Sequence, residues 1–138
     1  MNKSIVIVDT NVLFKALVAK NDYVRNQLFS VNYHFIAPNF LMVELYKHKQ
    51  RIAQASNNSS EEKLLELLHL LITSISFINE NLISNKSFIR AFELCKQIDE
   101  KDTPFVALSL ETNAPIWTYD TVLKKQLIQN NFTNFFEP

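Results

Sequence analysis

Two apolar runs that each end in an aspartate constrain this chain more than any other feature. Residues 5–8 read Ile-Val-Ile-Val and lead into Asp9, and residues 115–119 read Pro-Ile-Trp-Thr-Tyr and lead into Asp120. Short runs of this kind predict fully buried strands of a parallel sheet. Because ligands bind outside the carboxyl ends of such strands, we expect both aspartates at the functional edge of one sheet. Two carboxylates at one edge suggest a metal site.

Strand and helix patterns alternate along the rest of the chain. Strands are predicted at residues 4–8, 33–37, 75–78, 116–118 and near 132–136. Helices are predicted at residues 11–19, 22–30, 39–55, 61–74, 88–98, 102–110 and 122–129, with Ser59 and Glu62 as a capping box. This alternation predicts an α/β fold with a parallel sheet and helices on both faces. A length of 138 residues predicts one domain, residues 1–138.

The composition excludes several classes of site. The chain has no glycine, so it has no glycine-rich phosphate loop, no dinucleotide fingerprint and no Gly-x-Ser-x-Gly nucleophile elbow. A formal net charge of zero argues against a strongly basic nucleic-acid coat. The chain also lacks a signal-peptide pattern, an apolar run that could span a bilayer, and a partner for its one cysteine, Cys95. We therefore expect a cytoplasmic protein with no membrane partner and a buried, inert thiol.

Two more acids stand where they could join the first pair. Glu44 shares a helix face with Phe40 and Leu41, where a carboxylate is costly unless it is paired or binds a metal. Asp102 opens a helix whose apolar residues must pack on the sheet, and this packing fixes its position. Four carboxylates that converge repel one another, and a cation would offset that repulsion.

Each acid also has a plainer interpretation. Asp9, Asp102 and Asp120 could cap the helices that follow them, and Glu44 could reach solvent or pair with Lys47 or His48. A metal site would be made of oxygen ligands, which select Mg²⁺ or Mn²⁺ rather than Zn²⁺. Such ions suit phosphodiester cleavage, because they activate water and stabilise the leaving oxygen.

Four segments, taken in order, resemble a known family. They are residues 7–11 (Ile-Val-Asp-Thr-Asn), 40–48 (Phe-Leu-Met-Val-Glu-Leu-Tyr-Lys-His), 99–108 (Asp-Glu-Lys-Asp-Thr-Pro-Phe-Val-Ala-Leu) and 116–120 (Ile-Trp-Thr-Tyr-Asp). The ordered set, which spans nearly the whole chain, resembles the PIN domain, the metal-dependent ribonuclease fold found in toxins of the VapC type. Each motif is short, but their order and spacing together are fairly specific.

The resemblance implies a three-layer α/β/α sandwich with a central parallel sheet. It also implies a Mg²⁺- or Mn²⁺-dependent endoribonuclease that cleaves single-stranded RNA, with an antitoxin protein as the partner of a toxin of this type. The residues matching the family's catalytic and metal-binding quartet are Asp9, Glu44, Asp102 and Asp120. Asn11 and Thr118 match supporting polar positions, and Asp99 matches an acid found in only some members.

Two surface features have a functional and a plainer interpretation. Basic residues on the early helices and at the end of the helix 39–55 either contact RNA phosphates or form a solvated face; they are Lys15, Lys20, Arg25, Lys47, His48, Lys49 and Arg51. The nearly all-apolar segment 64–72 is either a core helix or an interface, for a homodimer or for a partner helix. Phe132, Phe135 and Phe136 could extend that interface.

Other functional classes fit less well. An aspartyl phosphotransferase of the haloacid-dehalogenase type would carry a second aspartate two residues after the first, where this chain has Asn11. A receiver-type signalling domain would need a lysine after the last strand. The remaining alternative is a catalytically silent PIN-like module that binds RNA or a protein.

Overall fold

The protein is built on a parallel sheet of four strands. This computed structural model describes residues 3–55 and 60–138. The strands are β1 (Ser4–Val8), β2 (Tyr33–Pro38), β3 (Ile75–Ile78) and β4 (Ile116–Trp117), and they lie in the order β3-β2-β1-β4. The register aligns Val6 of β1 with Phe35 of β2, and Val8 with Trp117 of β4. The neighbouring parallel strands β1 and β4 therefore end at the same edge, as the sequence predicted.

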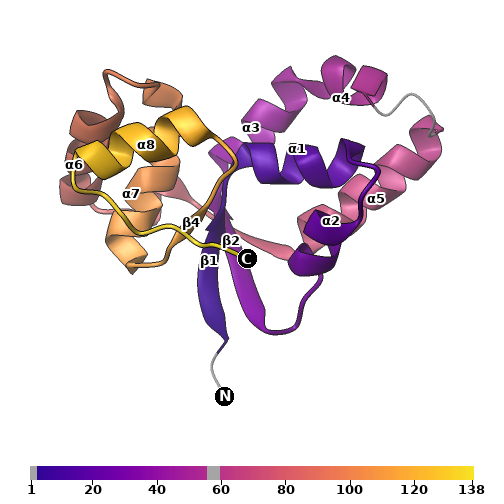
Figure 1. Cartoon of the computed structure of the whole chain (residues 1–138), viewed down its shortest axis with the longest axis horizontal. Helices are drawn as coiled ribbons and strands as arrows, with labels where there is room; N and C mark the ends of the chain where they lie inside the picture. Colours follow the sequence, from indigo (N-terminus) through magenta and orange to yellow (C-terminus); the bar gives the residue numbers. More distant parts are fainter. Residues whose placement is uncertain (1–2, 56–59) are drawn as a thin grey trace.

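Helices cover both sides of the sheet (Figure 1). One group consists of α1 (Thr10–Val18), α2 (Tyr23–Leu28), α3 (Phe40–Lys47), α4 (Lys49–Ala55) and α5 (Glu61–Thr73). The other consists of α6 (Asn85–Cys95), α7 (Thr103–Thr112) and α8 (Thr121–Gln129). Two short 3-10 helices, η1 (Glu80–Leu82) and η2 (Glu100–Asp102), precede α6 and α7. This arrangement confirms the predicted α/β fold with a central parallel sheet.

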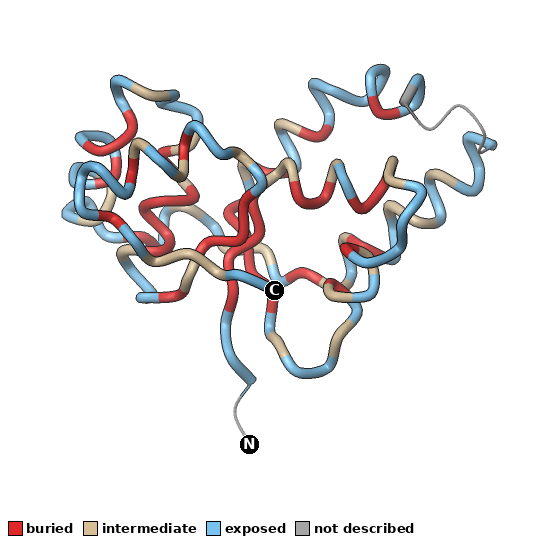
Figure 2. The backbone as a smooth tube through the Cα atoms, in the orientation of Figure 1, coloured by how far each residue is buried: buried red, intermediate tan, exposed pale blue. Residues whose placement is uncertain are grey.

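Apolar burial holds these layers together. Buried residues concentrate in the strands and in the helix faces packed on them (Figure 2). Ile7 and Val8 at the centre of β1 have no exposed surface, and the middle of α7, residues 105–109, is buried throughout. Each fully buried large apolar side chain contributes roughly 1.5–3 kcal/mol. Cys95 is also buried, as predicted.

Two asparagines adopt the left-handed backbone conformation that glycine usually takes at helix ends. Asn113 ends α7 with φ 60°, and Asn131 follows α8 with φ 70°. Asparagine tolerates this left-handed region better than other residues with a Cβ, so it can terminate a helix where glycine usually would. A chain without glycine can therefore still make compact helix ends.

Several predicted elements differ in their bounds. The helix expected at 39–55 is split at His48, whose φ of −105° and ψ of 14° end α3 before α4 begins. α6 starts at Asn85, three residues earlier than predicted, because Ser84 caps it by accepting a hydrogen bond from the N–H of Ser87. Ser59 of the predicted capping box lies outside the described residues, and the cap observed on α5 is Ser60. The last predicted strand is reduced to one bridge between Ile116 and Phe135.

The helix α5 contains the apolar segment 64–72, for which the sequence allowed a core helix or an interface. Of the α5 residues only Leu71 is fully buried, while Leu65 and Leu70 are 56% and 55% exposed. Leu64, Leu67 and Leu68 are partly buried against the core, so the core-helix interpretation holds for one face of α5. The interface interpretation, for the other face, stays a prediction. Phe135 cannot extend the same surface, because it pairs with β4 at one edge of the sheet whereas α5 leads into β3 at the other.

Candidate active site

Asp9 and Asp120 follow neighbouring strands and begin the helices α1 and α8. Asp9 directly follows β1, and one of its oxygens, Oδ1, accepts a 2.8 Å hydrogen bond from the N–H of Thr10. Asp120 follows β4 after two residues, and its Oδ1 accepts a 3.0 Å hydrogen bond from the N–H of Leu123. Both side chains are therefore helix caps, as the plainer interpretation required. Each cap bond uses Oδ1 and leaves Oδ2 outside the cap.

A hydroxyl and an amide tie these two helix starts together. The Thr118 hydroxyl donates a 2.7 Å hydrogen bond to Oδ2 of Asp9, which is only 5% exposed. The same hydroxyl accepts from the amide of Asn11 at 3.2 Å and from the N–H of Asp120 at 3.0 Å. The carbonyl oxygen of the Asn11 side chain accepts from the N–H of Tyr119 at 3.0 Å. Asn11 and Thr118 thus fix the end of β4 against the start of α1.

Glu44 reaches the same place from α3. Its Oε1 accepts a 2.7 Å hydrogen bond from the hydroxyl of Thr10, which directly follows Asp9. Within the part of the chain that the structure describes, Glu44 forms no ion pair with Lys47 or His48. Sequence reasoning did not single out Thr10, although a hydroxyl directly after the strand-ending aspartate is a signal that could have found it.

Asp102 and Asp99 come from the segment that leads into α7. Asp102 occupies the N-cap position of α7, but its side chain makes no cap hydrogen bond, so its carboxylate is not used by the helix. Asp99 is exposed, and its Oδ1 accepts a 3.0 Å hydrogen bond from the N–H of Lys101. The capping alternative is therefore observed for Asp99 on η2 rather than for Asp102.

All these acids line one pocket at the carboxyl edge of the sheet. The pocket has a volume of about 220 Å³ and is lined by Asp9, Thr10, Asn11, Phe14, Glu44, His48, Arg51, Asp99, Asp102 and Asp120. Residues 3–55 and 60–138 contain no group of three His, Cys, Asp or Glu side chains that could hold a metal ion as they stand.

Burial, with a smaller contribution from neighbouring charges, raises the pKa of two of these carboxyl groups. Burial raises the pKa of Asp9 to about 6, against the hydrogen bonds from Thr118 and Thr10 and with a smaller contribution from the charges of Glu44 and Asp120. The pKa of Asp102 is raised to about 8, first by burial and then by the charges of the neighbouring acids, Asp9 foremost among them. A cluster of this kind carries its full negative charge more easily when a cation enters it.

Two basic residues line the acidic pocket. His48 lines it at the end of α3 and is also exposed, and its contact with RNA stays a prediction. Arg51 lines it from α4, with its guanidinium 5.2 Å from the ring centre of Phe14. Phe14 carried no sequence signal, because an aromatic residue on an amphipathic helix ordinarily packs in the core.

Comparisons with known proteins agree with this architecture. A family model described as PIN domain matches residues 7–132. The chain therefore belongs to the PIN-domain family. Its fold is similar to a chain in the crystal structure of VapBC2 from Rickettsia felis bound to a DNA fragment from their promoter. That match has 17% sequence identity, covers 96% of each chain and has a TM-score of 0.63. No curated protein sequence matches this chain.

The structure also bears on the membrane prediction. In the described residues, no helix combines the length and the apolar character needed to cross a bilayer.

Proposed function

We propose that the protein is a metal-dependent endoribonuclease that cleaves single-stranded RNA. The observation that carries this proposal is the meeting of Asp9, Glu44, Asp102 and Asp120 in one pocket, although they come from four separate segments. Membership of the PIN-domain family supports it, because the resemblance implies this activity. The whole chain, residues 1–138, would then act as one nuclease domain.

The donor set fits a hard divalent cation. Its ligands would be carboxylate oxygens, which suit Mg²⁺ or Mn²⁺. The pKa values of Asp9 and Asp102 are raised first by burial and then by neighbouring acids, and a cation would offset both effects. Asp9 and Asp120 would hold the ion, with Glu44 and Asp102 as direct or water-mediated ligands. When bound, the ion activates water and stabilises the leaving oxygen.

The chain's own residues prepare this site. Thr10 and Thr118 orient the carboxylates of Glu44 and Asp9 through hydrogen bonds of 2.7 Å each. Asn11 fixes the backbone at Tyr119, next to Asp120. Asp99 at the rim would add negative charge for a second ion. Pre-oriented ligands of this kind reduce the reorganisation needed at the moment of reaction.

A cleavage assay tests the proposal. Purified protein should shorten a labelled single-stranded RNA in Mn²⁺, and excess EDTA or the substitution Asp9→Asn should abolish the activity. The matched control is Glu93→Gln, which removes an exposed carboxylate on α6 that pairs with Arg90 at 3.9 Å. Cleavage that persists in EDTA, or in Asp9→Asn, contradicts the proposal.

One observation favours the alternative of a catalytically silent module. The described residues hold no ready-made group of metal ligands, and a module that only binds RNA or protein would not need one. The same assay separates the two functions. RNA that is bound but never cut in Mg²⁺ or Mn²⁺, by protein of verified fold, supports the silent module.

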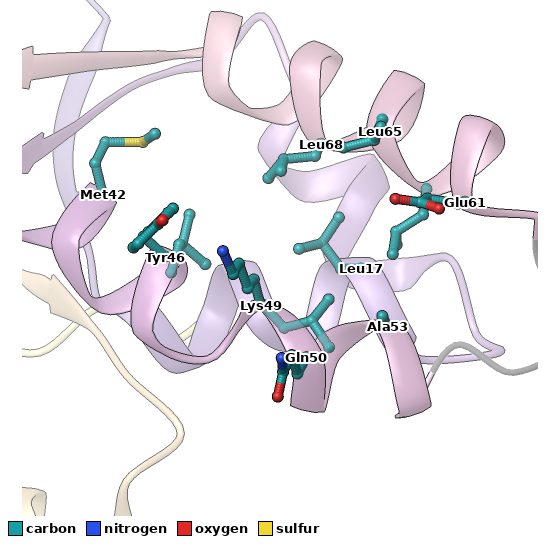
Figure 3. Close-up of a pocket in the computed structure, with 12 residues that line it drawn as sticks. Leu17, Met42, Tyr46, Lys49, Gln50, Ala53, Glu61, Leu65 and Leu68 are labelled. Atoms are coloured by element: carbon teal, nitrogen blue, oxygen red, sulfur yellow. The ribbon is translucent and has the colours of Figure 1, made fainter.

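We further propose that an antitoxin helix occupies an apolar groove on this protein. The groove has a volume of about 510 Å³ and lies between α5 on one side and α3 with α4 on the other. Figure 3 shows Leu65 and Leu68 on one wall, Tyr46 and Lys49 on the opposite wall and Leu17 between them. An apolar groove between helices suits the apolar face of an amphipathic helix. The similar fold in the VapBC2 structure supports a partner of this kind.

The groove proposal has a direct test. The product of a small neighbouring reading frame, co-produced with this protein, should form a stable complex that Leu65→Asp disrupts. Leu82→Asp is the matched control, because Leu82 is 75% exposed on η1 and does not line the groove. A complex that survives Leu65→Asp contradicts the proposal. If the protein is instead a homodimer that Leu65→Asp converts to a monomer, a second copy is the occupant.

A further inference from the structure

Two cation–aromatic pairs flank the acidic pocket along the first turns of α1. Phe14 and Lys15 are consecutive on this helix, one turn after Asn11. The ammonium of Lys15 lies 4.1 Å above the ring of Tyr119, and the guanidinium of Arg51 lies 5.2 Å from the ring centre of Phe14. Consecutive helix residues point about 100° apart. The two pairs therefore lie on different sides of the helix that begins at the carboxylates.

Tyr119 directly precedes Asp120, which lines the acidic pocket. It stands between Thr118, which bonds to Asp9, and Asp120, and its own N–H bonds to Asn11 at 3.0 Å. Its side chain is 36% exposed, and its ring centre lies 6.1 Å from that of Trp117. An aromatic ring held this firmly beside a reacting centre is suited to stacking a nucleotide base, since every base has a π-face.

A second hollow opens on the other side of Asp120. It has a volume of about 170 Å³ and is lined by residues 117–121, Lys124 and residues 136–138. Asp120 lines both this hollow and the acidic pocket. A base stacked on Tyr119 would have room beside it while its phosphate stays at the carboxylates.

Arg51 provides the second positive charge, on the side of α1 that carries Phe14. It lines the pocket with five acids, yet among the described residues it forms no ion pair with any of them. Its guanidinium stacks on Phe14 instead, which leaves the planar fork of N–H donors for another acceptor. Such a fork matches the oxygens of a phosphate.

The other basic residues considered from the sequence have different roles where their contacts are seen. Arg25 donates hydrogen bonds of 3.0 and 3.1 Å to the carbonyl oxygens of Ala16 and Ala19, so it caps the end of α1. Lys49 lies 4.1 Å above the ring of Tyr46 in the apolar groove. Arg51 differs from these residues because it lines the acidic pocket, and Lys15 because it lies over the ring of Tyr119, next to Asp120.

We propose that the Lys15–Tyr119 and Arg51–Phe14 pairs form the rim that holds single-stranded RNA across the carboxylates. Tyr119 stacks the base next to the phosphodiester bond that is cut, once Lys15 has moved from the ring of Tyr119 to a backbone phosphate. Lys15 and Arg51 contact backbone phosphates on either side of the acidic pocket. This inference rests on the proposed nuclease function and adds to it how the substrate is bound. It predicts little sequence preference, because phosphate contacts and stacking do not read base edges.

Binding and kinetics with full-length protein test this rim. The binding probe is a fluorescent single-stranded RNA of mixed sequence in buffer containing Ca²⁺, and the kinetic assay uses the same RNA in Mn²⁺. Tyr119→Ala should weaken binding roughly tenfold, and Tyr119→Phe should keep it, because the ring remains. Arg51→Ala and Lys15→Ala should each reduce the salt dependence of log Kd by about one unit. These variants should raise KM more than they lower kcat.

Matched controls and four outcomes complete the experiment. Tyr23→Ala and Arg90→Ala remove an exposed tyrosine and an exposed arginine away from the pocket, and they should leave binding unchanged. RNA binding and cleavage that both depend on the rim support the inference and the nuclease together. Rim-dependent binding without cleavage supports the inference but contradicts the nuclease. Cleavage with unchanged KM and Kd in all rim variants overturns the inference alone, and a protein that binds no RNA overturns both.

Discussion

Replacing Asp9 by asparagine should make the metal-free protein more stable at pH 8. The pKa of Asp9 is raised to about 6 from its ordinary 3.8, first by burial. An aspartate with a raised folded-state pKa contributes a stability that is fully present below pH 3.8 and lost as the pH rises through 6. At 1.36 kcal/mol per pKa unit, the ionised side chain at pH 8 therefore destabilises the fold by about 3 kcal/mol.

Asparagine removes this charge but disturbs one hydrogen bond. Its Oδ1 can still accept from the N–H of Thr10, but an amide nitrogen would face the Thr118 hydroxyl, which now donates to Oδ2 of Asp9. A lost hydrogen bond costs about 1 kcal/mol. The net gain is about 2 kcal/mol at pH 8. It falls below about 1 kcal/mol at pH 5, where wild-type Asp9 is mostly protonated in the folded state.

Urea and thermal denaturation in EDTA measure this gain. For a chain of this size, about 2 kcal/mol corresponds to a rise in Tm of roughly 6 °C at pH 8. Glu93→Gln is the control and should change stability by less than about 0.5 kcal/mol, because that carboxylate is exposed. Saturating Mn²⁺ should stabilise the wild type and not Asp9→Asn. An Asp9→Asn protein that is less stable than wild type at both pH values refutes the electrostatic reasoning.

Three further predictions follow from the same contacts. Thr118→Val should lower the free energy of unfolding by about 1–3 kcal/mol in urea titrations, since it leaves buried polar groups around Asp9 unpaired; an unchanged midpoint contradicts this role. Asn113→Val should cost about 1–2 kcal/mol, because a β-branched residue is strained at φ 60°, whereas Asn113→Gly should be neutral or stabilising. Burial raises the pKa of the Cys95 thiol to about 12, so iodoacetamide should modify Cys95 only after denaturation; rapid alkylation of the folded protein at pH 8 contradicts this.

The architecture could be predicted from the sequence because its signals are local and strong. The run Ile5–Val8 is short, apolar and β-branched, which favours a buried strand, and its last three residues are buried. Asp102-Thr103-Pro104 marks the start of α7. The break at His48 could not be predicted, because nothing in residues 39–55 disfavours one continuous helix. Whether the outer face of α5 is covered could not be predicted either. Hydrophobic periodicity shows that a face is apolar but not whether the same chain covers it.

The candidate site was predictable in its acids and less so in its supporting contacts. Asp9 and Asp120 follow the ends of two parallel strands, so the sequence predicts that the two aspartates lie at the same edge of the sheet. The hydrogen bond from Thr10 to Glu44 joins residues 34 positions apart and depends on how α3 packs, which no local pattern specifies. The same holds for Arg51, whose charge is visible in the sequence but whose place over Phe14 is not.

The position of a bound ion tests the central claim most directly. A crystal of this protein soaked in Mn²⁺ should show an anomalous difference peak about 2 Å from carboxylate oxygens of Asp9 and Asp120, within reach of Glu44 and Asp102. Manganese peaks found only elsewhere on the protein, with the pocket between these four acids empty at saturating Mn²⁺, would contradict the account.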